Sequence, residues 1–202
     1  MECFTREQVQ KAVESKDYRW FEGGDYNLNI VGIRNSDTQG KVTNKFDDCV
    51  TVSYSVNGEM MFHCFGATTD PGSHWERNLM NKDGVAILVP GQYRGSHIIG
   101  LHQGKYEALR QKSPLKVYRD KNKDGVYDFT EESIKEGIYG INIHRATSRE
   151  GGKSTQIDRW SAGCQVIAAN SDFKLFMELT NKSAKLYGNS FTYTLIESKD
   201  IV

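Results

Sequence analysis

The chain lacks an excess of charge of either sign. Its 202 residues carry 26 lysines and arginines against 26 aspartates and glutamates, so the formal net charge is zero. Proteins that bind nucleic acid or an anionic membrane surface concentrate basic residues, because these neutralise phosphates. The local basic residues Lys121 and Lys123 are interleaved with acidic ones. We therefore expect no nucleic-acid partner.

Long hydrophobic runs are also missing. No apolar stretch approaches the roughly 20 residues that a membrane helix needs. The N-terminus, MECFTREQVQKAVESKD, lacks the apolar segment of a secretory signal. We expect no membrane insertion, synthesis in the cytoplasm without a signal peptide, and no lipoprotein role for Cys3.

Cysteine is scarce as well, with four residues and no C-x-x-C pair. This excludes a zinc knuckle and a thioredoxin motif, and four cysteines are too few for a disulfide scaffold of this length. Cys49 and Cys64 lie in strand-like runs and are predicted to be buried apolar residues. Cys164 stands in a different context, discussed below.

What the chain does contain is alternation of apolar and polar residues, which is typical of strands. Predicted strands cover Asn27–Ile33, Cys49–Val56, Glu59–Phe65, Val85–Val89, His97–Leu101, Leu115–Tyr118, Gly140–His144, Gln165–Ala168 and Phe191–Ile196. Asn57-Gly58 between two of them is a strong hairpin signal. The length suits one sizeable domain. We predict a β-rich α+β fold, a mixed β-sheet or β-sandwich with a few helices.

Two helices are predicted. Thr5 and Gln8 form a capping box that starts a helix ending near Ser15, in an N-terminal extension over residues 1–24 ahead of a domain over 25–202. A late helix begins at a cap on Asn170 or Ser171 and runs to about Lys182. Its apolar face is Phe173, Phe176, Met177 and Leu179, and Gly188 follows its C-terminal end.

The most informative stretch for function is Gly140-Ile-Asn-Ile-His144 followed by Ser161-Ala-Gly-Cys164. A thiol needs a base to become a nucleophile near neutral pH, and an imidazole is the usual one. Ala162 and Gly163 leave room for a substrate, and the amides of Gly163 and Cys164 are candidates to hold an oxyanion. The carbonyl of Arg145 is one candidate to orient the imidazole.

This order and spacing resemble the L,D-transpeptidase catalytic domain (YkuD-type), in which a His precedes a Ser/Thr-His-Gly-Cys turn. The resemblance covers roughly residues 45–197, is clearest at Gly140–His144 and Trp160–Val166, and points to a phage-borne branch. An upstream turn of that family is loosely echoed by Val89-Pro-Gly-Gln-Tyr93. The resemblance implies a β-rich catalytic domain that acts on peptidoglycan stem peptides.

Carried over residue by residue, the resemblance makes Cys164 the nucleophile and His144 the base, places Gly163 in the oxyanion turn, and lets Ser161 shape that turn. The chain departs from the family's pattern at Ala162, Arg145 and Val166. Arg145, Arg159 or Gln165 could compensate for the missing polar groups. The predicted substrate contacts are Arg145, Arg159, Trp160, His102 and Tyr93.

A second motif is the segment Asp120–Glu131, which fits the twelve-residue calcium loop with Gly125 at its sharp turn. The predicted ligands are Asp120, Asn122, Asp124, the Val126 carbonyl, Asp128 and Glu131. The preceding residues predict a strand where an EF-hand has a helix, so a polar turn is the alternative. Any calcium would be structural, since a Cys–His pair requires no cofactor.

The sequence thus predicts a cysteine-dependent acyl-transfer enzyme, either a phage cell-wall hydrolase (peptidase) or an L,D-transpeptidase. It would act on the cell wall after release in lysis or as a virion component. The alternative is a non-catalytic cell-wall-binding or virion structural module derived from that fold. The oligomeric state stays open.

Overall fold

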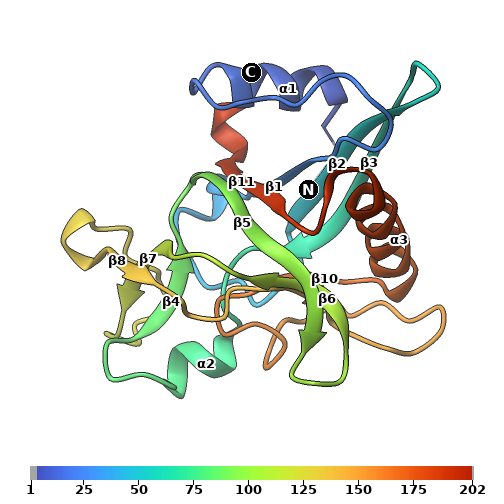
Figure 1. Cartoon of the computed structure of the whole chain (residues 1–202). Coiled ribbons are helices and arrows are strands. Elements are labelled where there is room, and N and C mark those ends of the chain that lie inside the picture. The colour runs from blue at the N-terminus through green and yellow to red at the C-terminus, as the bar shows by residue number, and fades with distance from the viewer. Residues whose placement is uncertain (1–3, 202) are drawn as a thin grey trace.

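Eight strands close into a mixed β-barrel in the computed structural model, which describes residues 4–201 (Figure 1). Around the barrel they are β1 (Asn29–Arg34), β11 (Phe191–Glu197), β5 (Gly91–His102), β6 (Tyr106–Gln111), β9 (Ile143–Arg145), β10 (Gln165–Ile167), β3 (Glu59–Thr68) and β2 (Asp48–Val56). The pairs β1–β11 and β9–β10 are parallel and the others antiparallel. The predicted β-rich α+β class is confirmed, but the sheet closes on itself instead of forming a sandwich.

A separate three-stranded sheet lies beside the barrel, in the order β4 (Val85–Leu88), β7 (Leu115–Asp120), β8 (Lys135–Gly137). In the view of Figure 1 it projects on the side opposite helix α3 (Asn170–Tyr187). Its antiparallel register places Arg119 opposite Ala86. Ala86 and Arg119 both line a cavity that residues of the barrel also line.

The N-terminal helix α1 (Arg6–Glu14) begins with the predicted capping box, in which Thr5 accepts from the Gln8 amide and Gln8 accepts from the Thr5 amide. Val9 and Val13 are buried and share a cluster with residues of the barrel, including Ile33 and Ile196. The predicted extension therefore packs across one end of the barrel (Figure 1). Cys3 lies outside the described residues.

Helix α3 buries the four predicted apolar residues, and Gly188, at a φ of 85°, ends it. The predicted cap is wrong: Ala169 holds the cap position with no side-chain bond, and Asn170 is the first helical residue. Ala169 pairs with Lys153 in a β-bridge, so the chain enters the helix one residue earlier than the side chains suggest. A short helix α2 (Ser73–Arg77) was not predicted; three 3-10 turns cover Ser36–Thr38, Glu131–Ser133 and Ser198–Asp200.

Tertiary pairing overrides local preference in β6. The sequence YEALRQ is made largely of good helix formers, yet it pairs residue by residue with β5 from His97–Gln111 to His102–Tyr106. The sequence analysis did not predict strands β6 and β8, and β5 is longer than predicted. The Asn57-Gly58 hairpin is confirmed, with both residues at positive φ.

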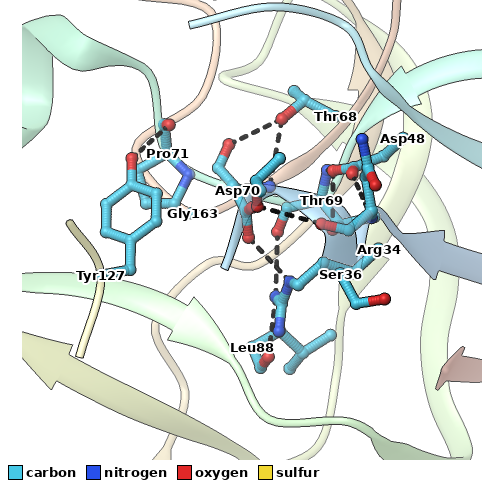
Figure 2. A network of polar contacts seen from close by, with 12 residues as sticks. Arg34, Ser36, Asp48, Thr68, Thr69, Asp70, Pro71, Leu88, Tyr127 and Gly163 are labelled. Atoms are coloured by element: carbon cyan, nitrogen blue, oxygen red, sulfur yellow. Dashed lines mark hydrogen bonds and ion pairs between the residues drawn. The ribbon is translucent and has the colours of Figure 1, made fainter. Parts of the chain in front are cut away.

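A buried polar network ties together the ends of β1, β2, β3 and β4 (Figure 2). Arg34, only 2% exposed, donates from Nε to Asp70 at 2.8 Å and from Nη2 to the Leu88 carbonyl at 2.9 Å. Asp48 accepts from the amide and hydroxyl of Thr69, at 2.6 and 2.9 Å. The network is close to saturated, as buried polar groups must be.

The charges of this network shift one another's pKa. Burial and the nearby Asp70 carboxylate raise the pKa of Asp48 to about 7, against the lowering effect of the Asn35 and Thr69 amides. Burial also raises the pKa of Asp70, while Arg34 opposes that shift. Burial lowers the pKa of Arg34, but the surrounding carboxylates outweigh it and the net shift is upward. Arg34 therefore stays a cation that the two aspartates neutralise.

Candidate active site

Cys164 and His144 line the same cleft, a cavity of about 1070 Å³ between the barrel and the small sheet. His144 is the middle residue of β9, and Cys164 immediately precedes β10. Because β9 and β10 pair in parallel, with Val166 opposite His144, the two residues come from neighbouring strands. Sequence reasoning predicted that these residues form one site, and the structure brings them to one cleft.

The turn before Cys164 is fixed by Ser161. The Ser161 hydroxyl donates to the Cys164 carbonyl at 2.8 Å and accepts from the Gly163 amide at 3.1 Å. Gly163 has a φ of 132°, and a Cβ there would lie 2.3 Å from the Ala86 carbonyl oxygen of β4. Only glycine fits this close approach without movement of the backbone.

The two candidate oxyanion donors differ. The Gly163 amide is already bonded to Ser161, so it is not free in this conformation. The Cys164 amide has no hydrogen-bond partner among the described residues. The structure therefore offers one free amide at the turn, where the sequence suggested two.

The Cys164 side chain is half-buried and is held by the segment before His144. Its thiol donates to the Gly140 carbonyl at 3.2 Å and accepts from the Asn142 amide at 3.5 Å. Burial raises the pKa of the thiol to about 11, and the Asn142 amide opposes this only partly. The resting cysteine is a thiol, although a catalytic cysteine is expected to have a pKa below the roughly 8.5 of a free thiol.

The His144 imidazole is 4% exposed and its tautomer is set by the Arg145 carbonyl, which lies 2.9 Å from Nδ1. A carbonyl can only accept, so the proton is on Nδ1 and the Nε2 lone pair is free to take a proton. Burial, followed by the neighbouring His102, lowers the pKa of His144 to about 4. At neutral pH it is an uncharged base. No hydrogen bond joins it to Cys164 within residues 4–201.

His102, a predicted substrate contact, stacks on His144 with ring centroids 4.2 Å apart. Its Nδ1 lies 3.1 Å from the side-chain nitrogen of Asn142. The side-chain oxygen of Asn142 accepts from the Gln111 amide at 2.9 Å, which fixes the orientation of the Asn142 amide group. This fixes His102 as a neutral acceptor at Nδ1. Burial, with Arg110 and Lys105, lowers its pKa. His102 thus lies against the candidate base and within the cleft.

Of the other predicted substrate contacts, three line the cleft and one does not. Arg145, Arg159 and Trp160 line the cleft, and Trp160 is 47% exposed. The Arg145 guanidinium lies over the Tyr106 ring, 4.1 Å from its centroid. Tyr93 does not line the cleft: it lies at the other end of β5 from His102, pairs with Tyr193 of β11, and its hydroxyl donates to the Val89 carbonyl at 2.6 Å. Tyr93 is therefore a packing residue here.

Gln165 connects the cysteine turn to the buried network. Its side-chain nitrogen donates to the Gly163 carbonyl at 3.3 Å and the Thr69 carbonyl at 3.5 Å, and its oxygen accepts from Tyr193 at 2.8 Å. The residue is fully buried. Gln165 therefore holds the turn from the protein interior and does not line the cleft.

The candidate calcium loop folds as successive side-chain turns. Asp120, Asn122 and Asp124 each accept from the amide two residues on, and the Asn122 nitrogen donates to Asp124 and Asp128. Within residues 4–201, no three His, Cys, Asp or Glu side chains converge as a metal site requires. The loop is anchored by Tyr127, which donates to the Pro71 carbonyl at 2.6 Å (Figure 2). Calcium binding stays a prediction.

Asn142, Tyr106 and Arg119 are among the cleft residues that the sequence analysis missed. Asn142 shares the strand face of His144 by its spacing of two, which is a signal that could have been read. Tyr106 lies on barrel strand β6 and Arg119 on β7 of the small sheet; both reach the cleft through tertiary structure, so no local signal marks them.

Comparisons of this chain with protein-family models, with curated proteins and with solved structures found no match in any of the three. None of the helices in the described part of the chain is long and apolar enough to cross a membrane.

Proposed function

We propose that this chain is a cysteine acyl-transfer enzyme with an L,D-transpeptidase-like catalytic domain, of a phage-borne branch, that acts on peptidoglycan stem peptides. The observation that carries the proposal is the placement of Cys164 and a neutral His144, with Nε2 free, in one cleft. The resemblance of the two motifs supplies the substrate class.

The mechanism starts from a neutral pair. The Cys164 thiol leaves the Gly140 carbonyl and gives its proton to His144 Nε2 as sulfur attacks a peptide carbonyl. The Cys164 amide is the available donor for the oxyanion that forms. Collapse releases an amine, which takes the proton from His144, and leaves a thioester on Cys164.

The acceptor then determines the reaction. Water yields a hydrolase and a second amine yields a transpeptidase, with His144 again taking a proton from the acceptor. We favour hydrolysis, in a protein that acts on the cell wall after release in lysis or as part of a virion.

The test is incubation of the protein and its Cys164→Ala variant with muropeptides of several stem types, followed by mass spectrometry. We expect loss of a residue or crosslink, or a new crosslink, only with Cys164 intact. Unchanged muropeptides with both proteins would support the non-catalytic wall-binding module instead, and equal conversion by both would exclude Cys164 as nucleophile.

A further inference from the structure

The cleft concentrates positive charge in a chain that has none in excess. Its walls include four cations: Lys105, Arg119, Arg145 and Arg159. No aspartate or glutamate between residues 4 and 201 lines it, although the chain has 26 of them. No ion pair in that range involves any of the four cations. A neutral protein with an acid-free cationic cleft favours an anionic ligand.

Arg119 carries the clearest signal on the small-sheet wall. Its guanidinium lies over the Tyr139 ring, 4.5 Å from the centroid, and Nη1 donates to the Gly84 carbonyl at 3.0 Å. Its Nε is buried and has no acceptor within the described residues. A buried donor without an acceptor is costly. The Nε–Nη2 edge of a guanidinium is a fork that matches the two oxygens of a carboxylate.

Arg145 provides a matching position on the barrel wall. It directly follows the candidate base His144, and its guanidinium is stacked on Tyr106. The two arginines thus belong to different sheets that border the same cleft, and each guanidinium lies over an aromatic ring. Contact with a ring orders a guanidinium, and the donors that are not bonded within the chain remain available to a ligand.

We infer that the cleft selects an acidic peptide, with one carboxylate bound at the Nε–Nη2 edge of Arg119 and a second at Arg145. The reacting carbonyl would lie between them at Cys164. This inference rests on the proposed function for the reacting bond, but the recognition of carboxylates is independent of turnover. The anion is taken as a carboxylate and not a phosphate because the proposed substrate is a peptide.

Binding to the inactive Cys164→Ala protein tests the inference. The probes are a stem tetrapeptide with free carboxylates and matched peptides with each carboxylate amidated in turn, measured by calorimetry. We expect amidation of a recognised carboxylate to weaken binding about tenfold or more. Arg119→Gln should weaken the acid peptide equally and leave one amidated form unaffected. Lys116→Gln, an exposed cation of the same strand outside the cleft, should change neither.

Amidation alters only the peptide, so the test survives a variant that fails to fold. Equal affinities for acid and amidated stem peptides would overturn the inference and leave the proposed function standing. If the stem peptide does not bind at all, the carboxylate site is tested by calorimetry with an acetylated Glu-Ala-Glu peptide and its fully amidated form. A preference for the acid form supports the carboxylate site while the proposed function fails, and no preference overturns the site.

Discussion

Two arginines in this protein, Arg34 and Arg119, show how differently one side chain can be used. In the buried network, Arg34 has acceptors for Nε and Nη2 and two aspartates nearby. In the cleft, Arg119 leaves Nε buried without an acceptor inside the described chain. The first arrangement is complete within the chain and holds strand ends together. The second leaves one donor unpaired, and we propose that a carboxylate of the ligand accepts from it.

The two regions meet at the cysteine turn. Gln165 joins the Gly163 carbonyl to Thr69, and the Gly72 amide donates to the Ser161 carbonyl at 2.8 Å. The network therefore supports the turn from the protein interior, while the Cys164 amide and the His144 Nε2 have no hydrogen-bond partner among the described residues.

The largest expected effect is on the network. Arg34→Met should lower the free energy of unfolding by about 3–5 kcal/mol, because it leaves Asp70 and Asp48 buried without their cation. Arg119→Met should cost about 1 kcal/mol, mainly the bond to Gly84. Urea unfolding measures both, with the exposed Arg149→Met as control. Equal losses for Arg34 and Arg119 would remove the contrast between the two regions.

Calcium binding would stabilise the region of the buried network, because Tyr127 of the candidate loop donates a hydrogen bond to Pro71, the neighbour of Asp70. If the loop binds calcium, a hundredfold excess over Kd adds about 2.7 kcal/mol to the free energy of unfolding. Thermal unfolding with calcium, with magnesium and with a chelator measures this. A melting temperature that is the same in all three excludes calcium stabilisation.

At the junction, Gly163→Ala should affect both regions. The added Cβ meets the Ala86 carbonyl oxygen at 2.3 Å, and the φ of 132° is strained for alanine. We expect a loss of about 1–3 kcal/mol in stability together with a drop in activity. Gly58→Ala, at a turn with nothing near its Cβ, controls for positive φ alone. Equal costs at both glycines would show that the contact with Ala86 is not limiting.

The smallest expected effect is a shift in pH dependence. A protonated His144 cannot accept the thiol proton, so kcat/KM should fall only as the pH drops through about 4, well below the ordinary 6.5. His102→Gln removes a neighbour that lowers this pKa, and the acid limb should move to higher pH. A profile whose acid limb lies near 6.5 in the unmodified protein would contradict the buried, neutral base.

Parts of the fold could be predicted because their signals are local. The Thr5–Gln8 capping box, the Asn57-Gly58 hairpin and the apolar face of α3 each follow from a few adjacent residues. Closure of the barrel could not, because it depends on pairing between distant strands. The helix-forming sequence of β6 shows the limit most clearly, since its partner β5 decides its structure.

The site likewise has parts that local sequence signals predict and parts that only the tertiary structure reveals. The Cys164 turn and His144 were predicted from residue types and spacing, and the structure places both in one cleft. Tyr93 was misplaced because an aromatic residue near a turn does not reveal which way its strand pairs. Arg119 and Tyr106 were missed because only the tertiary structure brings the small sheet and β6 to the cleft.

The central claim is that Cys164 is acylated with His144 as base. Intact-mass measurement of single-turnover reactions with a stem tetrapeptide tests it in the unmodified protein and in the Cys164→Ala, His144→Ala and Ser148→Ala variants, the last an exposed cleft serine as control. We expect an acyl adduct on Cys164 in the unmodified protein and Ser148→Ala. It should be absent in Cys164→Ala and form about 10²–10⁴-fold more slowly in His144→Ala. An adduct that persists in Cys164→Ala, or forms equally fast without His144, would contradict the account.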